Sequence, residues 1–156
     1  MKRYLPVLVL ALGLVSVSLL APRHAMATLG ESVVSVEKDH RALAGVRGTV
    51  TDRIGYTVRE IVADAYRVRE YVAPAGIVFA VAWNGLAHPD LTTLLGSYAG
   101  KYRQAVKNSP RSKGRRDYRI NTDTLVVEKW GHMRNLQGRA YDPALLPSGV
   151  SIDEIK

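Results

Sequence analysis

One pattern of eight residues occurs twice in this sequence, ten residues apart, and it constrains the fold more than any other feature. The copies span residues 56–63 and 66–73, and Tyr, Val, Arg, Glu, Val and Ala recur in both in the same order. Both copies alternate in the way that a β-strand does when its two faces differ. The repeat therefore predicts two neighbouring strands of an antiparallel hairpin.

The turn between the copies decides which side chains share a face. A three-residue turn over residues 63–65 places Val62 opposite Tyr66 and keeps both apolar sets on one side of the sheet. A two-residue turn shifts the register by one residue and mixes the faces. We expect the three-residue turn, because it gives the hairpin one apolar face.

The remaining strands follow from apolar runs and turn signals. Residues 77–83 form an uninterrupted apolar run after Pro74-Ala75-Gly76, and they predict the most buried strand. Residues 125–130 and 133–141 predict a second hairpin that turns near Gly131-His132. Residues 143–156 contain apolar side chains but also two prolines, so we expect them to lie against the body without forming a strand.

Two segments have helical spacing. Residues 32–44 mix apolar and charged positions and stop before Gly45, which predicts a short N-terminal helix. A second helix is expected to begin at Asp90, whose carboxylate can cap it, and to run to Val106. Its apolar stripe consists of Leu91, Leu94, Leu95, Tyr98, Tyr102 and Val106.

These elements together predict an α+β fold. We expect an antiparallel sheet of about five strands with the 90–106 helix packed on one face, plus the short N-terminal helix. Residues 28–156 are sufficient for a single domain with a core of its own.

The first 27 residues have the features of a secretory signal peptide. Lys2 and Arg3 precede an apolar run over residues 5–21, and Ala25-Met26-Ala27 matches the small-x-small pattern at which signal peptidase cleaves. Cleavage before Thr28 predicts a periplasmic or secreted protein with no membrane span after processing. The alternative is an uncleaved membrane anchor, because the run approaches the length of about 18 residues that spans a bilayer.

Charge and cysteine content narrow the class of protein further. The net charge of the whole chain is +8, and it falls to +5 when Lys2, Arg3 and Arg23 leave with the signal peptide. There is no cysteine, so the fold depends on packing and hydrogen bonds and not on disulfides.

Several short segments resemble a known family. They are residues 76–83, Pro89-Asp90-Leu91, Leu94-Leu95-Gly96, Gly131-His132-Met133 and Gly138-Arg139-Ala140-Tyr141. In these segments the chain resembles a family of small exported proteins from Gram-negative bacteria that is known only as a domain of unknown function. The resemblance spans most of the chain after residue 28. It implies export and a common fold but no catalytic or ligand-binding residue.

Candidate catalytic groups are few. With the expected register, Glu60 and Glu70 lie diagonally on one sheet face, and a buried carboxylate pair can act as general acid and base. A small cell-envelope enzyme using Glu70, Glu60 and a histidine is therefore the alternative function, although arginines beside each glutamate favour ion pairs. His40, His88 and His132 do not have a metal-ligand spacing, and no phosphate-binding glycine loop or nucleophile elbow occurs, so neither a metal nor a cofactor is indicated.

Basic residues concentrate before and within a loop after the second helix. The candidate binding residues for an anion or a partner are Lys107, Arg111, Lys113, Arg115 and Arg116. The ordinary alternative is a solvated loop that keeps the protein soluble. Nucleic acid is not an expected partner, because export separates the protein from it and only Tyr118 offers a stacking ring there. We expect a non-enzymatic accessory or binding protein that recognises an anionic envelope component or a protein partner.

Overall fold

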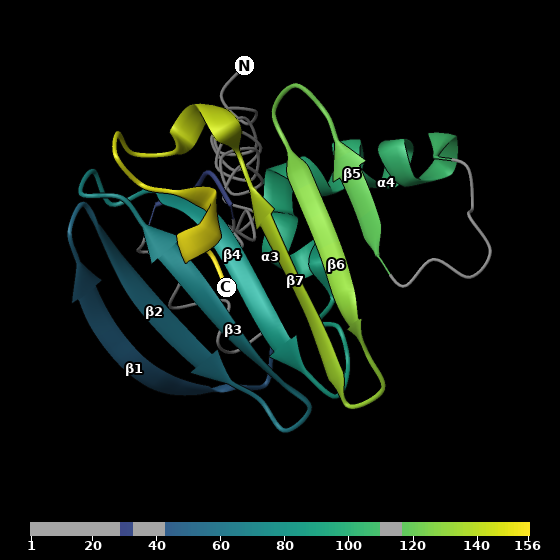
Figure 1. The fold of residues 1–156 in the computed structure, drawn as a ribbon, viewed down its shortest axis with the longest axis horizontal. Coiled ribbons are helices and arrows are strands. Elements are labelled where there is room, and N and C mark those ends of the chain that lie inside the picture. Colours follow the sequence, from purple (N-terminus) through teal and green to yellow (C-terminus); the bar gives the residue numbers. More distant parts are fainter. Residues whose placement is uncertain (1–28, 33–42, 110–116) are drawn as a thin grey trace, which may run out of the picture.

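The computed structural model describes residues 29–32, 43–109 and 117–156. Its centre is a seven-stranded antiparallel sheet with the strand order β1-β2-β3-β4-β7-β6-β5 (Figure 1). The strands are β1 (Val46–Arg53), β2 (Tyr56–Val62), β3 (Tyr66–Val72), β4 (Val78–Gly85), β5 (Tyr118–Asn121), β6 (Val126–His132) and β7 (Asn135–Tyr141). The fold is a mostly β form of the expected α+β class.

The repeated pattern forms the β2–β3 hairpin, as predicted, but the predicted register is wrong. Ala63 donates its backbone N–H to Tyr66 at 2.9 Å, so the turn contains only Asp64 and Ala65, and Val62 lies opposite Arg67. The prediction assumed that only one face of the hairpin is buried. Both faces are covered in this protein, so the mixed arrangement gives each apolar set a core of its own.

The predicted buried strand is confirmed as β4. Its residues Val78 to Trp83 are all buried, and β4 occupies the middle of the sheet between β3 and β7. Such a strand is covered on both faces, which explains why its sequence is apolar without alternation.

The second predicted hairpin is β6 and β7. Its turn lies at Met133-Arg134, between the paired residues His132 and Asn135, and therefore two residues later than predicted. Arg134 adopts a positive φ of 66° in this turn.

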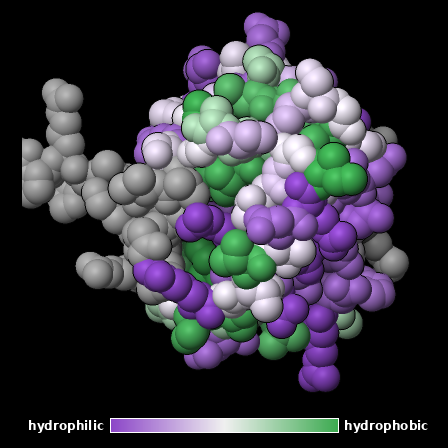
Figure 2. Space-filling view, turned by 90° about the vertical axis from the view of Figure 1, so that its left-hand side faces the viewer, coloured by the Kyte–Doolittle hydropathy of each residue, from purple (hydrophilic) through white to green (hydrophobic). Residues whose placement is uncertain are grey.

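Two strands were not predicted, so the expected number of about five is wrong. All but one residue of the edge strand β1 are exposed, and its sequence therefore lacks the apolar alternation that marks a half-buried strand. Figure 2, which faces this side of the molecule, shows separate hydrophobic patches among hydrophilic surface. At the other edge, β5 has only four residues, of which Ile120 alone is buried.

The predicted long helix begins as expected but is interrupted. Asp90 caps α3 (Leu91–Leu95) by accepting a hydrogen bond from the backbone N–H of Thr92 at 2.8 Å. Gly96 then has a φ of +43°, and a 3₁₀ turn, η2 (Gly96–Tyr98), leads into α4 (Ala99–Asn108). Both parts of the interrupted helix pack on the same core, α3 through Leu91, Leu94 and Leu95 and α4 through Ala99 and Tyr102.

The expected N-terminal helix over residues 32–44 lies mostly outside the described residues. At its ends, Ser32 forms an isolated β-bridge with Ile77, and Leu43 and Ala44 lie in a turn, so none of these three residues is helical. Leu29, just before this range, is fully buried in the core.

The sheet has a core on each side. On the first side, here the helix face, α3 and η2 cover a cluster that includes Ile61, Val68 and Trp83. On the second side, here the tail face, residues 143–156 cover a cluster that includes Tyr71, Phe79 and Ile155. Figure 1 shows the helices behind the sheet and the last residues of the chain in front of it. The prediction that this tail lies against the body is therefore confirmed.

Two short 3₁₀ turns shape the tail. They are η3 (Pro143–Leu145), capped by Asp142, and η4 (Ile152–Glu154), which has a capping box between Ser151 and Glu154. In the described part of the chain, no helix is long and apolar enough to cross a membrane.

Two glycine substitutions test the packing of the sheet. A Cβ at Gly138 would overlap the Trp83 indole and lie 2.7 Å from the Glu128 carbonyl oxygen, whereas a Cβ at Gly100 in α4 would meet open space. We expect Gly138→Ala to lower the free energy of unfolding by about 1–3 kcal/mol through overpacking. Gly100→Ala should be neutral or stabilising by up to about 1 kcal/mol. Urea unfolding curves measure both, and an unchanged midpoint for Gly138→Ala would contradict this packing.

Candidate functional site

A row of charged side chains crosses the tail face at right angles to the strands. In order across the sheet, the paired positions are Arg119, Glu128, Arg139, Ala82, Arg69 and Glu60. Residues directly opposite one another on neighbouring strands point to the same face. The row therefore alternates in charge on each side of Ala82, whose small side chain leaves space between Arg139 and Arg69.

On the β5–β7 side of the row, Glu128 lies between two arginines. Its carboxylate accepts a hydrogen bond of 2.6 Å from Nε of Arg139 and forms an ion pair of 3.3 Å with Nε of Arg119. The side chains of Glu128 and Arg139 are mostly covered, whereas that of Arg119 is 60% exposed. Arg119 is therefore the member of this group that solvent or a ligand reaches most easily.

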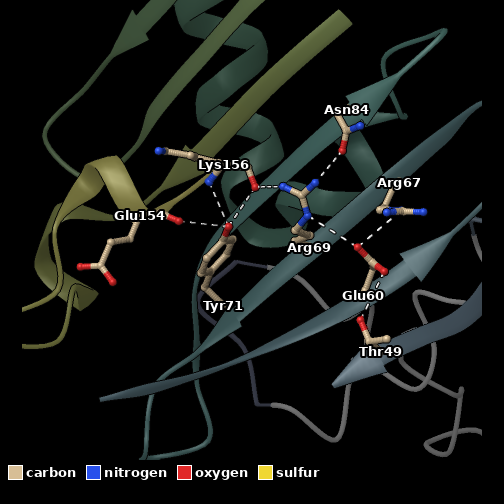
Figure 3. A network of polar contacts seen from close by, with 8 residues as sticks. All are labelled: Thr49, Glu60, Arg67, Arg69, Tyr71, Asn84, Glu154 and Lys156. Atoms are coloured by element: carbon tan, nitrogen blue, oxygen red, sulfur yellow. Dashed lines mark hydrogen bonds and ion pairs between the residues drawn. The ribbon is translucent and has the colours of Figure 1, made fainter. Parts of the chain in front are cut away.

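On the other side of the row, Arg69 connects three elements (Figure 3). It forms an ion pair with Glu60 at 3.6 Å, donates to Oδ1 of Asn84 at 2.9 Å and donates to the backbone oxygen of Lys156. Arg67 adds a second ion pair to Glu60 at 3.4 Å. Glu60 is thus held by two guanidinium groups, and Arg69 is fixed from three directions.

The last residues of the chain lie between Arg69 and Arg139. Tyr71 donates its hydroxyl to the Lys156 backbone oxygen and accepts from the Lys156 N–H, both at 2.9 Å (Figure 3). From the other direction, Arg139 donates to the backbone oxygen of Ile152 at 2.7 Å. Ile155 is fully buried between these contacts.

Tyr56 holds the same segment through a side-chain contact. Its hydroxyl donates to Oε2 of Glu154 at 2.8 Å. A backbone hydrogen bond from Ser151 and then this contact lower the pKa of the Glu154 carboxyl. Glu154 therefore remains ionised over the ordinary pH range.

The last residues separate two hollows on the tail face. The first, here the β5–β7 hollow, has a volume of about 700 Å³ and is lined by Arg119, Trp130, Gln137 and Arg139 on the sheet side. The second, here the β1–β3 hollow, has a volume of about 660 Å³, and its walls include Arg53, Tyr56 and Glu60. Asp153 and Lys156 line both.

Trp130 gives the β5–β7 hollow an aromatic wall. The Arg139 guanidinium carbon lies 5.7 Å from the centroid of the Trp130 ring, within the range of a cation–π contact. The indole N–H donates to Oε1 of Gln137 at 3.2 Å. A hollow with an aromatic wall and a few oriented polar groups is the usual form of a ligand site.

The structure separates the two glutamates that were predicted to lie on one face. Glu60 lies opposite Arg69 on the tail face, whereas Glu70 lies opposite Arg59 on the helix face and is 1% exposed. The two-residue turn is the reason, because it shifts the register by one residue and so reverses the faces of β3 relative to β2. The two carboxylates cannot act together as an acid–base pair across the sheet.

The described histidines do not complete an acid–base site with these two glutamates. His88 accepts a hydrogen bond of 2.8 Å on Nδ1 from the Trp83 indole N–H, and burial and then the positive charge of Lys129 lower its pKa. His132 is exposed at the end of β6, and His40 lies outside the described residues. Within the described ranges, no three His, Cys, Asp or Glu side chains are grouped so that they could hold a metal ion.

Most of the predicted basic site lies outside the described residues. Lys107 is exposed in the last turn of α4, and Arg111, Lys113, Arg115 and Arg116 fall in the segment that is not described. Sequence reasoning missed Arg139 and Trp130 as candidate site residues. The alternation along β6 and β7 was the available signal, because it places Glu128 and Trp130 on the same face as Gln137 and Arg139.

Comparison with known proteins gives a family but no function. The sequence model of a family described as "Protein of unknown function (DUF2844)" matches residues 25–155. No curated protein and no solved structure matches the chain.

Two tyrosines, the buried Tyr56 and the partly buried Tyr98, predict how stability depends on alkaline pH. Burial first, and then hydrogen bonds to Glu154 and Asp142, raise the pKa of Tyr56 and of Tyr98 from 10.0 to about 12. The stabilisation from each group is fully present below the unfolded-state pKa, about 10, and is lost as the pH rises toward about 12. Tyr56→Phe and Tyr98→Phe should each make this loss shallower, and the double variant shallower still. Urea unfolding at about pH 9 and about pH 11 measures it; equal losses in all variants would contradict the assignment.

Proposed function

The chain belongs to the DUF2844 family, and we propose that it is an exported, non-enzymatic binding protein of the cell envelope that recognises an anionic ligand. The ligand site of this proposal is the β5–β7 hollow. The observation that carries it is the exposed Arg119 guanidinium in a hollow of about 700 Å³ that also has an aromatic wall.

The basic segment that precedes three of the lining residues supports an anionic ligand. Asp117, Tyr118 and Arg119 line the hollow and directly follow the basic segment that ends with Arg115 and Arg116. A ligand at Arg119 is therefore within a few residues of further positive charge. Such clustering raises the local concentration of anions and gives a salt-sensitive affinity.

Asp117, Glu128 and Asp153 line the hollow together with its basic residues, so binding of an anion would depend on oriented donors and not on simple charge attraction. Glu128 is neutralised between Arg139 and Arg119, so its carboxylate orients Arg119 and repels an incoming anion less than an isolated carboxylate would. Charge-assisted bonds from guanidinium groups fit phosphate and carboxylate geometry. The phosphate groups of a lipid or lipopolysaccharide head group have this chemistry.

The contacts of the acid–base candidates favour a binding role over catalysis. Two arginines hold Glu60, and Nδ1 of His88 is occupied by the Trp83 indole N–H. Each group has a structural partner, and Glu60 and Glu70 lie on opposite faces. A general base must reach the substrate proton directly or through one water, which this arrangement does not favour.

A charge reversal in the hollow tests the proposal. Arg119→Glu should weaken binding to lipopolysaccharide micelles or to vesicles containing phosphatidylglycerol by about tenfold. Arg103→Glu is the matched control, because it makes the same change in net charge at an exposed position of α4, away from the tail face. Titration calorimetry at about 50 mM and about 300 mM salt gives the affinities and their salt dependence.

The two probes identify the source of the phosphate. Binding to only one of them assigns the ligand to that class of head group. Equal weakening by Arg119→Glu and Arg103→Glu would show general charge attraction and would overturn the hollow as the site. Unchanged binding after Arg115→Glu with Arg116→Glu would remove the basic segment from the proposal.

A further inference from the structure

The tail face binds the segment from Ser151 to Lys156, here the terminal segment, mainly through its main chain. Arg139 donates to the backbone oxygen of Ile152, and Arg69 and Tyr71 donate to that of Lys156. The Lys156 N–H in turn donates to the Tyr71 hydroxyl. Contacts to main-chain atoms depend little on which side chains the bound segment has.

A single side chain of the terminal segment is fully buried. Ile155 lies in the tail-face cluster beside Phe79, Ala80 and Ala82, whereas Asp153 and Glu154 are exposed. Main-chain hydrogen bonds combined with a pocket for selected side chains are the usual means by which proteins recognise peptide segments. The terminal segment is thus bound in the manner of a peptide ligand.

The receiving surface is held in place by groups outside the terminal segment. Glu60 and Asn84 orient Arg69, and Glu128 orients Arg139. Ala80 and Ala82, which share the tail-face cluster with Ile155, belong to the central strand β4. A surface ordered in this way does not have to be built when a ligand arrives, which lowers the free-energy cost of binding.

The surroundings of the terminal segment allow it to lift. Ser148 and Gly149 before it are exposed, and Gly149 has a φ of +85° in a turn. The two hollows on either side of it, of about 700 and 660 Å³, share Asp153 and Lys156 as walls. Displacement of the terminal segment would join them into one groove along the row from Arg119 to Glu60.

We propose that the tail face is a docking site for a peptide segment of a partner protein, and that the terminal segment occupies this site until the partner displaces it. The partner segment carries an aliphatic residue for the Ile155 pocket, preceded by an acidic residue that accepts from Tyr56 as Glu154 does. The occupant seen in the structure defines this chemistry. Because the terminal segment is tethered, its effective concentration is in about the millimolar range, and a competing peptide binds measurably only when the tethered segment is weakened.

The test changes the occupant and the site separately in the full chain. The probe is a fluorescent peptide of residues 147–156, and the control peptide carries Ile155→Ala. The Ile155→Ala chain should bind the probe at least about tenfold more tightly than the unmodified chain, because its own segment competes less. Adding Arg69→Ala to that chain should weaken probe binding, and the control peptide should bind neither chain. Fluorescence anisotropy gives the affinities.

Three results would overturn the proposal. The first is equal affinity of the two chains for the probe. The second is no binding of the probe by an Ile155→Ala chain that circular dichroism shows to be folded. The third is a concentration-dependent dimer of the unmodified chain that Ile155→Ala abolishes, because it would show that the occupant is a second copy.

Hydrogen exchange in the unmodified chain provides a test that needs no variant. The backbone amides of Glu154, Ile155 and Lys156 should exchange at least about tenfold faster than those of the buried strand β4, because they open locally. Equal exchange rates would mean that the terminal segment leaves the sheet only when the whole protein unfolds, and this would overturn the proposal.

Discussion

The two-residue turn at Asp64-Ala65 fixes the register between β2 and β3, and the composition of both sheet faces follows from that register. Because side chains alternate strictly along a strand, a shift of one residue would exchange the two faces of β3 relative to β2. In the observed register Tyr71 joins Tyr56 on the tail face, and Val68 joins Ile61 on the helix face. Each set then has an apolar layer to cover it.

The same register creates the polar chemistry of the tail face. It places Arg69 opposite Glu60 and, through Ala82 of β4, in line with Arg139 and Glu128. The gap at Ala82 admits the last residues of the chain, whose backbone oxygens accept from both arginines. The two proposals share part of this face: the anionic ligand uses the exposed Arg119 and the peptide segment uses the buried pocket of Ile155, while Arg139 and Ile155 belong to both because they line the β5–β7 hollow.

Local patterns in the sequence predicted those elements that depend on near neighbours. The repeat, the apolar run of β4, the cap at Asp90 and the packed tail were all correctly predicted, because each is encoded within a few residues. The faces of the β2–β3 hairpin were not, because the choice of turn depends on what covers the sheet from distant parts of the chain. The exposed β1 was missed because it has no apolar alternation, and β5 was missed because its alternation is only four residues long. The alternation of the β6–β7 hairpin could have placed Arg139 beside Glu128, but its alignment with Arg69 through Ala82 depends on strands that are far apart in the sequence.

A disulfide test in this cysteine-free chain measures the register directly. Glu60 and Arg69 are directly opposite, and alternation from the bonded pair Ala63 and Tyr66 makes theirs a non-hydrogen-bonded pair with a Cα separation of about 4.5 Å. Glu60→Cys with Arg69→Cys should therefore form a disulfide on mild oxidation, as mass spectrometry of the intact protein would show. Glu60→Cys with Glu70→Cys should remain reduced, because these positions lie on opposite faces. The reverse pattern would contradict the register and with it the arrangement of the tail face.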